Sequence, residues 1–173
     1  MKKPIKTLFS DIGGVLLTDG WDHNARKSAS AKFKLEFSEM ENRHQMTFAV
    51  YEEGKLTLEE YLDVTVFYEE RQFTLDQFRE FMFAQSKPHS EMIDFVRQLR
   101  ESYDLKIIVV SNEARELNAY RIQTFKLGEF VDSFVSSCFV HIRKPDAEIF
   151  RLALDIAPTL PAQILSPENP PIL

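Results

Sequence analysis

The sequence predicts an α/β protein in which helices cover a parallel β-sheet and a further group of helices is inserted after the first strand. Short apolar runs typical of buried strands alternate with amphipathic segments, which indicates a parallel sheet covered on both faces. Between the first two of these runs, residues 18–88 have almost no strand character. Polar residues follow the ends of the strand-like runs, where parallel sheets collect ligands.

Four segments are expected to form the strands of the sheet. The run Leu-Lys-Ile-Ile-Val-Val gives the strongest signal, because its second half is β-branched throughout. The first run is short and ends close to a glycine pair, and the last is cut short by Pro167. In chain order the expected strands are residues 5–10, 105–110, 130–142 and 163–165.

The inserted stretch carries clear signals of helices. Thr57 with Glu60, and Thr74 with Gln77, have the spacing of capping boxes, in which two side chains satisfy each other's backbone N–H groups at a helix start. Eight of the 15 phenylalanines of the chain fall in this stretch. We therefore expect residues 18–88 to form helices around a small aromatic core of their own.

Three amphipathic helices are expected between the later strands. Ser90 is a candidate N-cap of the first, Gly128 lies near the end of the second, and Pro145 suits the first turn of the third. Their expected apolar faces are Met92, Phe95, Val96 and Leu99, then Leu117, Tyr120 and Phe125, then Ile149, Phe150, Ala153 and Leu154.

Composition narrows the class of protein. The 173 residues, 44% of them hydrophobic, suit one domain or a small core with an insertion. The net charge of −6 argues against nucleic acid as the main partner. No apolar run approaches the length needed to span a membrane. Cys138 is the only cysteine, so no internal disulfide forms, and we expect a cytoplasmic protein.

The polar residues at the strand ends are the candidate site. Asp11 ends the first run and is followed by Ile-Gly-Gly, where small residues allow a ligand to approach closely. Ser111 and Asn112 follow the second strand, Lys144 the third and Glu168 the fourth. Because the carboxyl ends of parallel strands meet at one edge of a sheet, these groups are expected to converge.

This set of groups is what phosphoryl transfer to a carboxylate requires. Asp11 would attack phosphorus, and Mg²⁺ would be held by Asp11, the backbone carbonyl of Gly13 and Glu168. Ser111 and Asn112 would hold phosphate oxygens, while the rim lysine would bind the phosphate and balance the charge that develops. Helix capping for the first pair and a solvated loop for the lysine are the structural alternatives.

The motifs occur in the order found in the haloacid dehalogenase-like hydrolase superfamily, which the chain resembles over essentially its whole length. They are Asp-Ile-Gly-Gly-Val (11–15), Val-Val-Ser-Asn (109–112), Arg-Lys-Pro-Asp (143–146) and, less closely, Pro-Glu-Asn (167–169). The resemblance implies a Rossmann-like core, a helical cap, Asp11 as nucleophile and Mg²⁺-dependent hydrolysis of phosphate monoesters.

On this interpretation the core comprises residues 1–17 and 89–173, and residues 18–88 form the cap. The expected substrate is a small phosphorylated metabolite that the cap selects. The residues favour no particular metabolite and no particular oligomeric state.

One departure from the family pattern concerns proton transfer. Phosphatases of this superfamily carry a second aspartate two residues after the nucleophile, and here that position is Gly13. Asp19, Asp22 or His23 are possible substitutes, although each also suits an ordinary polar loop. Two alternatives therefore stay open: a binding or regulatory protein without turnover, and a dehalogenase, which needs neither a metal nor the second aspartate.

Overall fold

A parallel β-sheet with strand order β3-β2-β1-β4 lies at the centre of the molecule. The computed structural model of the chain describes residues 3–166, and within that range all pairings between these strands are parallel. Thr7 pairs with Lys106 on one side and Ile164 on the other, so the first strand lies inside the sheet. The strands are β1 (Thr7–Ser10), β2 (Lys106–Ser111), β3 (Ser133–Ser136) and β4 (Ile164–Leu165).

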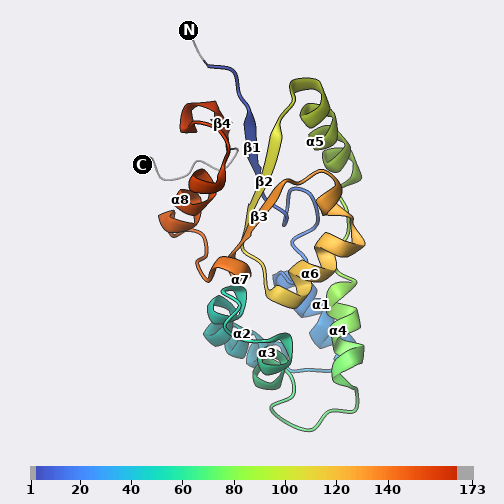
Figure 1. Cartoon of the computed structure of the whole chain (residues 1–173). Helices are drawn as coiled ribbons and strands as arrows, with labels where there is room; N and C mark the ends of the chain where they lie inside the picture. Colours follow the sequence, from blue (N-terminus) through green and yellow to red (C-terminus); the bar gives the residue numbers. More distant parts are fainter. Residues whose placement is uncertain (1–2, 167–173) are drawn as a thin grey trace.

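The helices form two groups, one on the sheet and one in a cap that faces the carboxyl ends of the strands (Figure 1). The sheet group comprises α5 (Ser90–Tyr103), α6 (Arg115–Thr124), α7 (Ser137–Val140) and α8 (Ala147–Ile156), with 3₁₀ turns η1 (Leu127–Glu129) and η2 (Pro161–Gln163). The cap comprises α1 (His23–Phe33), α2 (Phe37–Glu52), α3 (Leu58–Thr65) and α4 (Leu75–Phe83). The predicted α/β sheet with an inserted helical cap is therefore confirmed. No helix within residues 3–166 combines the length and hydrophobicity needed to cross a lipid bilayer.

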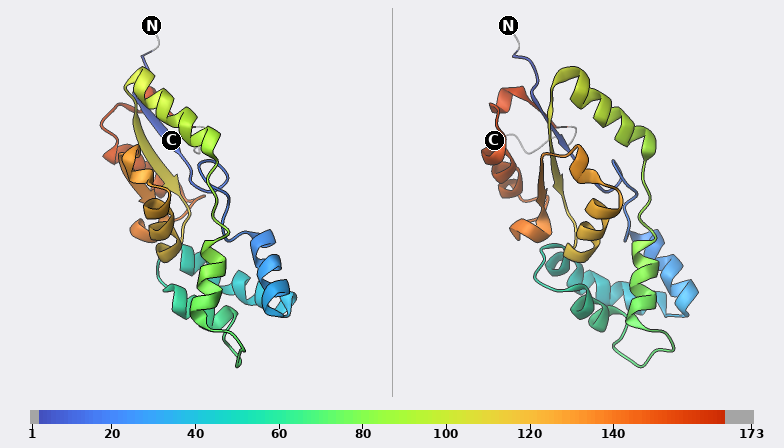
Figure 2. Two further views of the ribbon diagram at one scale, coloured as in Figure 1. Left: turned by 90° about the vertical axis from the view of Figure 1, so that its right-hand side faces the viewer. Right: turned by 45° about the vertical axis from the view of Figure 1, so that its right-hand side comes forward.

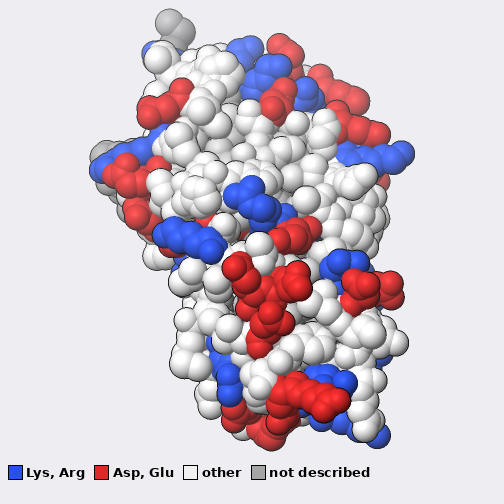
Figure 3. Space-filling model, turned by 60° about the horizontal axis from the view of Figure 1, so that its bottom comes forward, with Lys and Arg blue, Asp and Glu red and all other residues white. Residues whose placement is uncertain are grey.

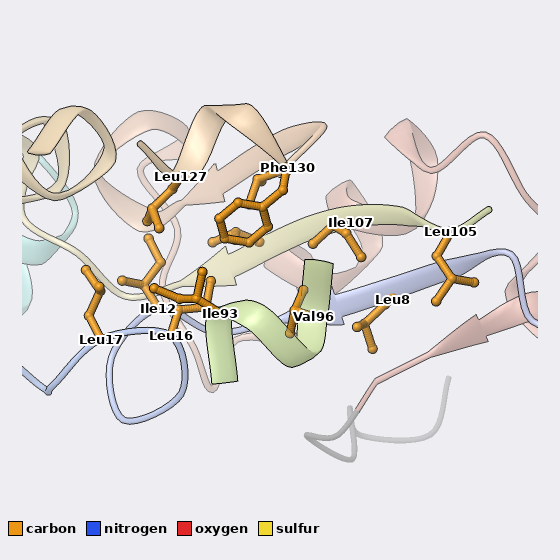
Figure 4. Packing of buried hydrophobic residues seen from close by; sticks show 12 residues of the cluster. Leu8, Ile12, Leu16, Leu17, Ile93, Val96, Leu105, Ile107, Leu127 and Phe130 are labelled. Carbon is orange, nitrogen blue, oxygen red and sulfur yellow. The ribbon is translucent and has the colours of Figure 1, made fainter. Parts of the chain in front are cut away.

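Alternating side chains of the strands build two separate cores, one on each face of the sheet. Leu8 and Ile107 point to the face covered by α5, where Val96 and Phe130 join them (Figure 4). The neighbouring residues Phe9 and Ile108 pack instead with Ile149 and Phe150 of α8, and Figure 2 shows α5 and α8 on opposite faces of the sheet. This alternation is the two-residue period of a strand, and it explains why both faces of the sheet must be covered.

The cap has an aromatic core, as its phenylalanine content predicts. Phe78 is fully buried there, and its ring lies 4.9 Å from that of Phe33 and 6.0 Å from that of Phe73. Both predicted capping boxes are formed, at Thr57 and at Thr74. Helices α1 and α2 lack such a signature in the sequence, and α6 closes the cluster from the core side with Ala114 and Leu117.

A hydrogen-bond chain within the cap includes a buried histidine. Trp21 Nε1 donates to the hydroxyl of Tyr61 over 2.9 Å, and the same hydroxyl lies 2.8 Å from Nδ1 of His44. Burial lowers the pKa of His44 to about 4, and the nearby positive charge of Arg26 acts in the same direction against the opposing effect of Glu41. His44 is therefore neutral at pH 7.

The two segments that connect cap and core are paired with each other. The Thr18 N–H donates to the carbonyl of Lys87 over 2.9 Å, and the Thr18 hydroxyl donates to the carbonyl of Gln85 over 2.8 Å. Two residues further into the core, the His89 N–H donates to the carbonyl of Leu16. The chain thus enters and leaves the cap through adjacent, mutually hydrogen-bonded strands of backbone.

The third expected strand is shorter than the sequence analysis placed it. Residues 130–142 were expected to be extended, but the strand covers only Ser133–Ser136 and Ser137–Val140 is helical. Ser136 pairs with Ser111, the last residue of β2, so the residues beyond it have no ladder partner. The Ser137 hydroxyl instead donates to the carbonyl of Glu52 over 2.6 Å, which ties this turn to the cap.

Two expected helix starts are also shifted. Ser90 is the first helical residue of α5 rather than its N-cap, which is His89 and makes no capping hydrogen bond with its side chain. Pro145 precedes α8 instead of lying in its first turn, because Asp146 is the N-cap and accepts from the Glu148 N–H over 2.9 Å. An aspartate is among the preferred N-cap residues, because its carboxylate accepts a backbone N–H of the first turn that has no partner within the helix.

Gly54 is expected to be indispensable for the fit of the cap on α7. Its φ is +66°, and a Cβ built on it would lie 2.9 Å from the Cα of Cys138 and overlap its carbonyl oxygen. We expect Gly54→Ala to lower the free energy of unfolding by about 1–3 kcal/mol in urea titrations, because backbone atoms cannot move aside as a side chain can. Gly128→Ala is the matched control, since a Cβ there meets nothing within 4 Å. Equal effects of both substitutions would contradict the close packing described.

The neutral state of His44 predicts a pH dependence of stability. The unfolded chain takes up a proton at this histidine below pH 6.5, whereas the folded chain does so only near pH 4, so stability is lost as pH falls through this window. The stability difference between wild type and His44→Gln should shrink by about 2 kcal/mol from pH 7.5 to pH 5. Urea titrations at both pH values measure it, with His89→Gln, at an exposed histidine, as the control. A pH-independent difference would show that the folded protein protonates His44 over the same pH range as the unfolded chain, so that burial does not lower its pKa.

Candidate active site

A cavity of about 460 Å³ lies where the carboxyl ends of the strands meet the cap. Asp11, Ser111 and Lys144 from the core line it, together with Gln45 and Phe48 from α2 of the cap. The three core residues follow three different strands, so the convergence expected from the sequence is present. Cap and core both contribute walls, which makes the cavity a site between them.

Asp11 is held in a fixed orientation at the end of β1. Its Oδ1 accepts the backbone N–H of Ile12 over 2.7 Å, and its Oδ2 lies 2.7 Å from Nζ of Lys144. Both side chains are largely buried, at 17% and 15% exposed, so this ion pair is only weakly screened by water. The two contacts leave the carboxylate at the cavity wall with a defined face toward a ligand.

Asn112 holds the main chain of Lys144. Its Oδ1 accepts the Lys144 N–H over 2.8 Å, and its Nδ2 donates to the Lys144 carbonyl over 3.0 Å. The sequence analysis assigned Asn112 to substrate binding, and that role stays a prediction. The contacts present give it a different task, because a side-chain amide that bonds both peptide groups of one residue fixes where that residue's ammonium can reach.

Ser111 is buried beneath the cavity, and its hydroxyl lies 3.4 Å from Oε1 of Glu113. Glu113 is a residue that the sequence analysis did not single out. Its burial raises the pKa of this carboxyl to about 7, the ion pair with Arg121 opposes that rise, and the charge of Asp11 adds to it. A second carboxyl group therefore lies under the nucleophile candidate and responds to its charge.

Arg121 connects this buried carboxyl group to the cap linkers. Its guanidinium is almost fully buried and pairs with Glu113, while Nε donates to the Ser86 hydroxyl over 3.0 Å and Nη2 to the carbonyl of Thr18. Ser86 and Thr18 belong to the two segments that enter and leave the cap. No sequence signal marked Arg121, because an arginine on an amphipathic helix is usually solvated.

The cap wall carries charged residues that are already paired. Arg26 forms two hydrogen bonds with Glu41 at 2.7 and 2.8 Å, and these lower the pKa of Glu41 to about 2. Arg143 donates two hydrogen bonds to a single oxygen, Oε2, of Glu52, although burial still raises the pKa of that carboxyl. Neither arginine is therefore free to bind an anion without breaking an existing pair.

The structure separates the three residues suggested as substitutes for an acid at position 13. Asp22 is the N-cap of α1 and accepts from the Ala25 N–H over 2.7 Å. The His23 side chain is 61% exposed and lies 3.6 Å from Glu41. Asp19 lies beside Gly13 itself, with its Oδ1 3.5 Å from the position that a Cβ would occupy there.

The oxygen donors near Asp11 suit Mg²⁺ in kind and in number. Mg²⁺ prefers hard oxygen ligands and usually keeps several waters, binding through one or two carboxylates and the oxygens of a phosphate. The Asp11 carboxylate and the Gly13 backbone are at the cavity wall, and Glu168 lies outside the described residues. Within residues 3–166 no group of three or more His, Cys, Asp or Glu side chains is placed to hold a metal ion.

Solved structures of the same fold include hydrolases of one superfamily. A HAD family enzyme from Bacteroides thetaiotaomicron has a TM-score of 0.79 at 22% identity, over 95% of this chain and 84% of that one. That enzyme has also been solved in complex with magnesium and inorganic phosphate. A predicted HAD-like family hydrolase from Porphyromonas gingivalis has a TM-score of 0.71 at 18% identity, over 95% and 82% of the two chains.

The L-2-haloacid dehalogenase from Xanthobacter autotrophicus is more distant, with a TM-score of 0.62 at 13% identity over 94% and 69% of the two chains. One of its structures has chloropropionic acid covalently bound. No curated protein matches the chain significantly. The model of the haloacid dehalogenase-like hydrolase family matches residues 5–165. The chain thus belongs to the haloacid dehalogenase-like hydrolases.

Proposed function

We propose that the protein is a Mg²⁺-dependent phosphatase that acts on a small phosphorylated metabolite through an aspartyl-phosphate on Asp11. The observation that carries the proposal is the pair formed by Asp11 and Lys144, 2.7 Å apart at the wall of a cavity. A carboxylate oriented by a neighbouring ammonium is placed to attack an electrophile, and the ammonium is placed to hold the anionic group attacked.

The reaction begins with in-line attack of an Asp11 oxygen on phosphorus as the bond to the ester oxygen breaks. The Ile12 N–H fixes Oδ1 over 2.7 Å, so the other oxygen, now beside Lys144, is the one that we assign to attack. Lys144 moves its contact from this oxygen to the phosphate, and the Ser111 hydroxyl holds a second phosphate oxygen. Water then attacks the aspartyl-phosphate, releasing phosphate and regenerating Asp11.

Asp11, the carbonyl of Gly13 and Glu168 are the residues that we assign to the metal. Bound there, Mg²⁺ supplies positive charge that offsets the repulsion between the carboxylate and the phosphate. The solved complex of the Bacteroides thetaiotaomicron enzyme with magnesium and inorganic phosphate supports this assignment by analogy of fold.

Residues 18–88 are proposed to act as a cap that excludes water and selects the leaving group. The cavity of about 460 Å³ suits a small molecule rather than a polymer. On the face drawn in Figure 3, acidic and basic side chains are mixed and acidic ones gather near its middle, which does not favour a nucleic acid. We propose a cytoplasmic enzyme without a nucleic-acid or membrane partner.

The dehalogenase alternative is supported by one specific observation, which is Gly13 itself. Displacement of halide by Asp11 through an ester needs no metal and no proton donor at that position. The likeness in fold to the Xanthobacter autotrophicus enzyme is consistent with it. A binding protein without turnover is the remaining alternative, and the first experiment below separates all three.

Asp11→Asn is expected to abolish Mg²⁺-dependent hydrolysis of 4-nitrophenyl phosphate, because an amide cannot form the aspartyl-phosphate. Release of nitrophenol is followed with and without Mg²⁺ for wild type, the variant and Asp94→Asn, an exposed aspartate on α5 that should keep the wild-type rate. Retained hydrolysis in Asp11→Asn rules out the assigned nucleophile. Halide release from a 2-haloacid by a wild type that leaves the aryl phosphate intact establishes the dehalogenase instead, and turnover of neither compound indicates a binding protein.

Asn112→Leu is expected to lower kcat/KM for the same substrate by roughly 10–100-fold, because Lys144 then loses the two bonds that position its main chain. Asn112→Asp should lie between the variant and wild type, since it keeps the acceptor for the Lys144 N–H. Asn24→Leu, at an exposed position of α1, is the control. Unchanged kcat/KM in Asn112→Leu would show that Lys144 needs no such support.

A further inference from the structure

The chain lacks a proton-transferring side chain at position 13, yet an ester oxygen that leaves as an alkoxide needs a proton. We propose that Asp19 is the general acid and base of the reaction, occupying from a different point of the chain the space that a side chain at Gly13 would fill. This inference rests on the phosphatase function proposed above, and it adds a catalytic residue to it.

The first argument is position. A Cβ built on Gly13 has the Asp19 carboxylate as its nearest neighbour, with Oδ1 at 3.5 Å and the Asp19 Cα at 3.7 Å. Asp19 lines the same cavity as Asp11 and Lys144. The Asp19 carboxylate therefore lies beside the position that a side chain two residues after the nucleophile would occupy, although Asp19 is eight residues from Asp11 along the chain.

The second argument is that the backbone before Asp19 is anchored by hydrogen bonds and the backbone after it lies close against Arg121. The Thr18 N–H bonds the Lys87 carbonyl over 2.9 Å, and the Thr18 carbonyl accepts from Arg121. Gly20 has a φ of +75°, and a Cβ built on it would lie 3.0 Å from Cζ of Arg121. The loop thus follows the buried guanidinium closely, and a larger residue at position 20 would push Asp19 away from Gly13.

The third argument is that the Asp19 carboxylate is available. Throughout residues 3–166 it takes part in no hydrogen bond or ion pair, and its side chain is exposed at the cavity. Asp22 is occupied by capping α1, and His23 points to Glu41 at a largely exposed position. Of the candidates near Gly13, Asp19 alone combines proximity with an unused carboxylate.

The proton transfers balance as follows. As an Asp11 oxygen bonds phosphorus and the P–O bond to the ester oxygen breaks, the protonated Asp19 gives its proton to that oxygen and the product leaves as an alcohol. The Asp19 carboxylate then accepts a proton from the water that attacks the aspartyl-phosphate. Inorganic phosphate leaves, Asp11 is again a carboxylate, and Asp19 is again protonated.

The experiment compares two phosphate esters in wild type, Asp19→Asn and Asp22→Asn. Hydrolysis of an alkyl phosphate needs the acid, so Asp19→Asn should lower it by about 10²–10⁴-fold. 4-Nitrophenyl phosphate has a leaving group that needs no proton, so the variant should release a burst of nitrophenol equal to the enzyme present and then slow down, because water attack still lacks its base. Asn caps a helix as well as Asp does, so Asp22→Asn keeps α1 intact.

A second substitution makes the test independent of folding defects. The backbone of Gly13 lies outside the left-handed region, and a Cβ there has room, so Gly13→Asp is sterically compatible with the fold. Combined with Asp19→Ala, which empties that space, Gly13→Asp should raise the rate of alkyl phosphate hydrolysis at least tenfold above that of Asp19→Ala alone, because it returns a carboxyl group to the same place. A variant that had merely unfolded would not be rescued in this way.

The outcomes separate this inference from the function on which it rests. A wild type that hydrolyses neither ester overturns both. A wild type that hydrolyses both, with Asp19→Asn equally active on the alkyl ester, leaves the phosphatase standing and overturns the role of Asp19. If Asp22→Asn loses activity while Asp19→Asn keeps it, Asp22 is the general acid and base. If Asp19→Asn loses activity but shows no nitrophenol burst, and Gly13→Asp does not rescue Asp19→Ala, Asp19 has only a structural role.

Discussion

The buried guanidinium of Arg121 constrains more of this molecule than any other single group. A charge removed from water is tolerated only where partners satisfy it, and its loss leaves those partners buried and unpaired. Here the partners are Glu113 from the strand end, Ser86 from the segment leaving the cap and the Thr18 carbonyl from the segment entering it. The positions of both linkers and of a carboxyl group beneath the nucleophile therefore depend on one side chain of α6. That helix also packs into the aromatic core of the cap through Leu117.

The Asp11–Lys144 pair gives the site a resting state that resembles its loaded state. Each charge is paired with the other while both side chains are largely buried, so the pair compensates for the water that burial removes. In the reaction proposed here, a phosphate entering the cavity would replace the Asp11 carboxylate as the partner of the Lys144 ammonium. The electrostatic environment of Lys144 would then change little, whereas Asp11 would become available to attack. Such an exchange requires a lysine whose backbone does not drift, and the two hydrogen bonds from Asn112 supply that rigidity.

Much of this arrangement follows from local sequence rules, and the parts that do not have a common physical cause. Strand period, capping boxes and the polar residues after each strand depend only on neighbours along the chain. The positions of Asp11, Ser111 and Lys144 at the strand ends could therefore be predicted from the sequence. The bounds of α1 could not be predicted, because its buried residues form no apolar stripe: they are Ala25, Arg26, Ala29 and Ser30. Arg121 and Asn112 act on backbone groups far away in the sequence, and no pattern of residue types encodes such partners. The third strand was predicted to be too long, because its carboxyl end is set by the end of its partner strand β2 rather than by its own sequence.

The pairing of the two cap linkers has a consequence for how such a protein can change over evolutionary time. Thr18 and Lys87 are joined by a backbone hydrogen bond of 2.9 Å, so the whole excursion between them starts and finishes at one place on the sheet. Topologically, the cap is an enlarged loop. Its length and sequence can be exchanged without rethreading any strand, and the side chains at the strand ends beneath it keep their positions. In this fold the cap can therefore change in sequence and length while the side chains at the strand ends stay the same.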